Sequence, residues 1–131
     1  MRSLLTNTYL NIVPQPNDLV HVDNDVLVIE DSDITIVFTY PFDDDYSFGF
    51  HSEGGFTLCQ LVTIVRNKYK EMYQANEASN TVDLSVGRPT LLNIPQTDGM
   101  YGVWGHVIDD LCLWGIKYDD TTRTIILGID S

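Results

Sequence analysis

The amphipathic run in the middle of the chain is the feature that most constrains its fold. Thr57 precedes Gln60 by three residues, which is the spacing of a capping box at a helix N-terminus. The apolar residues that follow recur at spacings of three, four and seven, so they share one face of a helix. They are Leu58, Leu61, Val62, Val65, Tyr69, Met72 and Tyr73. The run therefore predicts one long helix that ends near Ala78.

Short alternating segments on both sides of this run predict a sheet. Apolar and polar residues alternate over 34–40 and again over 46–50, and the acidic turn at 43–45 between them favours an antiparallel hairpin. Further strands are expected at 19–22, 26–29, 111–118 and 124–129, the last two as a second hairpin, while 82–84 and 91–94 are edge strands or ordered loop. We therefore expect an α+β fold, in which an antiparallel or mixed sheet of about five to seven strands packs against one long amphipathic helix.

Length and composition indicate a single domain. A chain of 131 residues with 44% apolar residues is large and apolar enough to bury one core. We expect one domain over 1–131, with 1–18 as an N-terminal arm that docks on it and ends in a proline-rich turn. Cys59 and Cys112 are expected as reduced thiols. Without a signal-peptide run or about 18 consecutive apolar residues, the chain is predicted to be cytoplasmic and to make no membrane contact.

The charge of the chain restricts its partners. Nineteen acidic residues against seven basic ones give a net charge of −12, so the average surface repels nucleic acid. The first 53 residues hold ten of the acids and one base, Arg2. Such a surface can attract a basic protein or chelate a hard cation, and solubility alone also explains it. We therefore expect another protein, of basic character, as partner and no nucleic acid.

The segment 98–110 is the candidate binding site. It contains the aromatic residues Tyr101 and Trp104, three glycines, His106, and the carboxylates of Asp109 and Asp110. Glycine lets a backbone approach a ligand, tryptophan offers a large contact surface, and histidine titrates near neutral pH. The alternative is structural, with the glycines allowing Trp104 to pack on the helix and His106 donating to a backbone carbonyl.

Catalysis and metal binding have weaker support. His106 could act as an acid or base oriented by Asp109 or Asp110 if this stretch forms a helical turn, and Cys59 could then serve as nucleophile at the start of the helix. Neither spacing matches a specific motif, so no catalytic residue is assigned. The three histidines are scattered and no calcium-loop or phosphate-loop pattern occurs, so no metal and no cofactor is expected.

Four short segments carry a resemblance to a viral group of proteins. They are Gly-Phe-Thr-Leu at 55–58, Gly-Val-Trp-Gly-His at 102–106, Asp-Leu-Cys-Leu at 110–113 and Leu-Gly-Ile-Asp-Ser at 127–131. From residue 55 onward the chain resembles small uncharacterised proteins encoded by large DNA viruses. The resemblance implies a host-cytoplasmic or virion context and carries over no catalytic residue.

Three functional hypotheses follow from these features. The first is an acidic protein-interaction module, such as a viral accessory or virion-associated protein, that binds another protein through its acidic surface and the loop around Trp104. The second is a small hydrolase or transferase that uses His106 with Asp109 or Asp110. The third is a homo-oligomeric structural protein that pairs through an edge strand.

Overall fold

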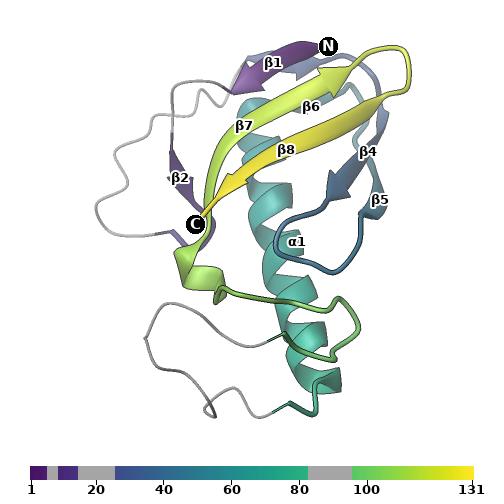
Figure 1. Cartoon of the computed structure of the whole chain (residues 1–131). Helices are drawn as coiled ribbons and strands as arrows, with labels where there is room; N and C mark the ends of the chain where they lie inside the picture. The colour runs from purple at the N-terminus through teal and green to yellow at the C-terminus, as the bar shows by residue number, and fades with distance from the viewer. Residues whose placement is uncertain (6–8, 15–25, 83–95) are drawn as a thin grey trace.

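The computed structural model describes residues 1–5, 9–14, 26–82 and 96–131 (Figure 1). The strands are β1 (Arg2–Leu5), β2 (Leu10–Asn11), β3 (Leu27–Ile29), β4 (Asp33–Phe38), β5 (Tyr46–His51), β6 (Phe56–Thr57), β7 (Cys112–Asp119) and β8 (Thr124–Asp130), and the helices are α1 (Leu58–Ser79) and the 3₁₀ helix η1 (Ile108–Asp110). Over these residues a six-stranded mixed sheet has the order β1-β7-β8-β4-β5, with β2 also paired to β7, and β3 pairs with β6. The predicted α+β fold class is confirmed.

Two antiparallel hairpins form most of the large sheet, as the alternating segments predict. Strands β4 and β5 pair from Asp33 opposite His51 to Phe38 opposite Tyr46, and β7 pairs with β8 in the same sense. The hairpins are joined by parallel pairing of β4 with β8, with Ile36 opposite Ile125. Because one face of this sheet packs on α1, alternate residues of β4 are buried.

The N-terminal arm is more regular than the sequence predicts. Its described parts at 2–5 and 10–11 are the strands β1 and β2, both antiparallel to β7. The described parts of the arm thus dock as strands of the sheet, which short runs without clear alternation did not reveal. The short strand β6 was also missed. The expected strand at 19–22 and the apolar pieces at 83–84 and 91–94 lie outside the described residues.

Helix α1 begins and ends close to the predicted positions. Thr57 caps it, with its side chain accepting from the backbone N–H of Gln60 and the Gln60 side chain accepting from the N–H of Thr57. Its buried residues are Leu61, Val62, Val65, Tyr69, Met72 and Asn76. The C-terminal part of α1 extends beyond the sheet, and the segment that leads to η1 lies against it (Figure 1). No helix among the described residues is long and apolar enough to cross a membrane.

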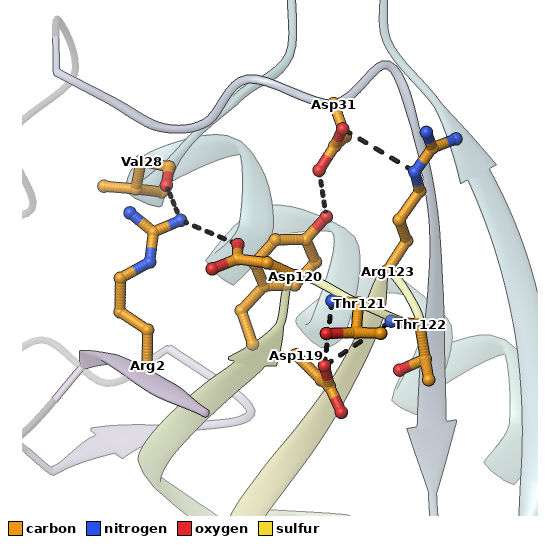
Figure 2. Close-up of polar contacts among 9 residues, drawn as sticks. Arg2, Val28, Asp31, Asp119, Asp120, Thr121, Thr122 and Arg123 are labelled. Carbon is orange, nitrogen blue, oxygen red and sulfur yellow. Dashed lines mark hydrogen bonds and ion pairs between the residues drawn. The ribbon is translucent and has the colours of Figure 1, made fainter.

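A polar network lies at the turn between β7 and β8, at the end of the large sheet away from the C-terminal part of α1 (Figure 1 and Figure 2). Arg2 donates to the carbonyl of Val28 at 2.9 Å and lies 3.5 Å from the carboxylate of Asp120. Asp31 accepts from the Tyr118 hydroxyl at 2.5 Å and pairs with Arg123 at 3.6 Å. Burial and the neighbouring Asp31 raise the pKa of Tyr118. These contacts tie β1 and the loop after β3 to the end of the large sheet.

Candidate interaction site

Asn76 fixes the candidate segment 98–110 to α1. Its side chain is 4% exposed, and its Oδ1 accepts from the backbone N–H groups of Tyr101 at 3.1 Å and Val103 at 3.4 Å. Its Nδ2 donates to Oγ1 of Thr97 at 3.1 Å. Sequence reasoning missed Asn76, although it lies four residues after Met72 on the apolar face of the helix. A lone amide on an apolar face is the signal that could have identified it.

The acidic turn after β4 joins this segment to form one surface. The N–H of Asp43 donates to the carbonyl of Tyr101 at 3.0 Å, and the N–H of Trp104 donates to the carbonyl of Pro41 at 3.1 Å. Gly102 has a φ of +58°, and a Cβ at this position would lie 2.4 Å from the Asp43 carboxyl group. A glycine is therefore needed where the two segments meet.

Aromatic side chains cover the junction of the two segments. The Trp104 ring is in edge contact with Tyr40, with 5.3 Å between ring centroids, and its Nε1 donates to the carbonyl of Phe42 at 3.3 Å. Tyr101 and Tyr46 make a second edge contact at 4.9 Å. Trp104 remains 38% exposed. Trp104 is thus oriented by Tyr40 and the turn after β4, whereas the structural alternative expected it to pack on the helix, and the residue stays partly exposed.

The charge of this surface is entirely negative. The segments 40–46 and 98–110 contain six aspartates and no lysine or arginine. Asp43 accepts from the Tyr46 hydroxyl at 2.5 Å, which raises the pKa of Tyr46 to about 12. Asp44 and Asp45 are exposed beside it. We define the acidic aromatic face as Tyr40, Asp43, Asp44, Asp45, Tyr101, Trp104, His106 and Asp110.

His106 lies at the border of this face, next to the end of β8. Its ring centroid is 5.7 Å from that of Tyr40 and 6.3 Å from that of Trp104. Its Nε2 is 3.1 Å from Oγ of Ser131, which is also 2.8 Å from the Tyr40 hydroxyl. Its Nδ1 is 3.9 Å from Oδ2 of Asp110. Sequence reasoning could not find Ser131, because no local pattern links it to a histidine 25 residues away.

The structure brings together four of the five predicted site residues. Tyr101, Trp104, His106 and Asp110 belong to the acidic aromatic face, and the helical turn η1 is what places Asp110 near His106. Asp109 is exposed and has no described contact with His106. The backbone N–H of His106 donates to the carbonyl of Trp104 at 2.9 Å, while its ring contacts Ser131.

Cys59 lies too far from His106 to act with it. Cys59 is in the first turn of α1, whereas the Tyr73 hydroxyl donates to the carbonyl of His106 at 3.0 Å. Tyr73 lies fourteen positions after Cys59 on α1, which corresponds to about 21 Å of helix. A nucleophilic cysteine acting with His106 is therefore excluded. In the described part of the chain, no three histidine, cysteine, aspartate or glutamate side chains gather in a way that could hold a metal ion.

The fold and this surface together define the class of protein. It is an α+β protein in which α1 and the β4–β5 hairpin support an acidic aromatic face. No family model, no curated protein and no solved structure matches the chain. The geometry of this chain alone is therefore the basis for its functional assignment.

Proposed function

We propose that the protein is an interaction module, a viral accessory or virion-associated protein, whose acidic aromatic face binds a basic segment of another protein. The observation that carries the proposal is a partly exposed tryptophan, Trp104, on a surface whose two segments, 40–46 and 98–110, contain six aspartates and no lysine or arginine. Arginine and lysine side chains stack on aromatic rings while pairing with nearby carboxylates. The face offers both kinds of contact within one surface.

The rigidity of the face also supports this function. Trp104 is oriented by hydrogen bonds from its backbone and its indole nitrogen to the turn after β4. An anchor that is already ordered loses little conformational entropy when a partner binds. The long-range field of a chain with a net charge of −12 would in addition speed the encounter with a basic partner.

Replacing Trp104 by alanine is expected to weaken the binding of a basic peptide about fivefold, because the cation–π contact is lost. The probe is a fluorescein-labelled peptide of alternating arginine and alanine, with affinity measured by fluorescence anisotropy. Trp114→Ala is the matched control, because Trp114 is 42% exposed and lies on β7, outside the face. Equal affinities of Trp104→Ala and the wild type would contradict the assignment of the anchor.

A small hydrolase is the second candidate function, favoured by the contact of His106 with Ser131 and the nearby Asp110. In this function Ser131 would be the nucleophile and His106 its general base. Asp110 lies beyond hydrogen-bonding distance of the ring, which weakens this candidate relative to the first. The test is hydrolysis of p-nitrophenyl acetate. Equal rates for wild type and a folded His106→Ala variant would exclude the hydrolase.

A further inference from the structure

A second binding site lies along α1, distinct from the acidic aromatic face. A groove of about 760 Å³ runs beside the helix. One wall is the flank of α1 from Thr63 to Asn80, and the other consists of the residues after β2 and the stretch from Val103 to Ile108. Strand β2 and η1 lie on the same side of α1 (Figure 1). We define this feature as the α1 groove.

The α1 groove has the opposite charge to the rest of the protein. Its described lining includes two bases, Arg66 and Lys70, and one acid, Glu77. This gives a local charge of +1 from a chain that has nineteen acids and seven bases. Arg66 and Lys70 are four residues apart, so their side chains lie on the same flank of the helix. An acidic group is therefore favoured here and disfavoured over most of the remaining surface.

The two cations of the groove differ in their contacts. The Nε of Arg66 donates to the carbonyl of Asn11 at 3.0 Å, which holds the guanidinium group against the opposite wall. Lys70 is exposed, and no described acid forms an ion pair with it. The neighbouring Lys68, by contrast, pairs with Glu71 at 3.2 Å and lies over the Phe48 ring. Lys70 is thus the cation best placed to meet an incoming carboxylate.

Apolar side chains form the floor and rim of the groove. Ile12 and Val103 are buried at its base, while Tyr73 and Ile108 are half-buried. Val107 remains 37% exposed at the rim. An occupant must therefore present apolar side chains as well as acidic ones.

The length of the groove favours a peptide segment over a small molecule. From Thr63 to Glu77 the helix flank is about 21 Å long, since each helical residue advances 1.5 Å. About six residues of extended chain cover that distance. Amide side chains at Asn67 and Gln74 line the same wall and can hydrogen-bond to the backbone of such a segment.

We propose that the α1 groove binds an acidic, apolar peptide segment of another protein, with Lys70 contacting its carboxylates. The chain would then carry two protein-binding sites of opposite charge preference. Val103 and Ile108 line the groove, whereas Trp104 and His106, on the same stretch of chain, belong to the acidic aromatic face.

The test is affinity selection from a phage library of random peptides about 12 residues long, roughly twice the length that spans the groove. Peptides selected on the wild type are expected to combine glutamate or aspartate with leucine, isoleucine or phenylalanine. Synthetic copies are expected to bind Lys70→Glu about tenfold more weakly, because an attraction becomes a repulsion. Lys117→Glu is the matched control, since Lys117 is exposed on β7 and its replacement changes the net charge equally.

Three outcomes would overturn this proposal: no enrichment of any peptide, enrichment of peptides without acidic residues, or an equal loss of affinity in Lys70→Glu and Lys117→Glu. Enriched basic peptides that lose affinity in Trp104→Ala but not in Lys70→Glu would overturn the groove and support the acidic aromatic face. If acidic peptides bind Lys70→Glu more weakly than the wild type and the arginine peptide does not bind at all, binding in the α1 groove would be supported and binding at the acidic aromatic face contradicted. Each of the two proposals can therefore be contradicted without affecting the other.

Discussion

Replacing Asn76 by alanine is expected to lower the free energy of unfolding by about 2–4 kcal/mol. The substitution removes the acceptor of the Tyr101 and Val103 N–H groups and the donor to Thr97. Val103 and Thr97 are buried, so water cannot easily replace the lost partners. For a chain of this size the loss corresponds to a fall in melting temperature of about 7–14 °C, measurable by calorimetry.

The control for this experiment is Asn67→Ala, the same truncation on an exposed position of α1. It is expected to change stability by less than about 0.5 kcal/mol. Asn76→Ala should also alter the fluorescence of Trp104, because the segment that carries this residue loses its attachment to the helix. If the two alanine variants had the same stability, Asn76 would not be the residue that holds the segment.

The elements predicted correctly from the sequence are those with local causes. The helix depends on the capping box at Thr57 and on apolar spacing within 22 residues. The hairpins of β4 with β5 and β7 with β8 depend on alternation and a short turn. In each case the residues that stabilise the element are close neighbours in the sequence.

The elements that were missed depend on distant partners. Strands β1 and β2 are short and become strands because β7, more than 100 residues later, supplies their hydrogen-bonding partners. The parallel pairing of β4 with β8 also joins residues that are far apart in the sequence, such as Ile36 and Ile125. Short segments carry too little periodicity to indicate such pairings, which only the assembled sheet determines.

The candidate site was predictable in composition but not in geometry. The unusual content of 98–110 pointed to Tyr101, Trp104, His106 and Asp110, which lie near one another in the fold. The contributions of Tyr40 and Ser131 could not be predicted, because they reach His106 from the ends of β4 and β8. The bases on α1 were partly predictable. The four-residue spacing of Arg66 and Lys70 places them on one helix face, but only the fold shows that this face borders the α1 groove, whereas Lys68 lies over the Phe48 ring.

Replacing Gly55 by alanine is expected to destabilise the fold by about 3 kcal/mol or more, through two effects that act together. Its φ of +96° is a conformation that residues with a Cβ rarely adopt. A Cβ at this position would also lie 2.1 Å from the carbonyl oxygen of Ile29, a backbone atom that cannot rotate away. The change would push β3 and β6 apart, where Ile29 pairs with Phe56. Urea unfolding followed by circular dichroism measures the loss.

The preceding glycine separates the two effects. Gly54 has a similar φ of +80°, but a Cβ there would meet no atom within 4 Å. Gly54→Ala is therefore expected to cost only the conformational strain, about 1–2 kcal/mol. The difference in the free energy of unfolding between the two variants gives the contribution of the close approach of Gly55 to Ile29. This approach allows Phe56, just before α1, to pair with β3. If both substitutions cost the same, backbone strain alone would explain the two glycines, and the close approach would contribute nothing to stability.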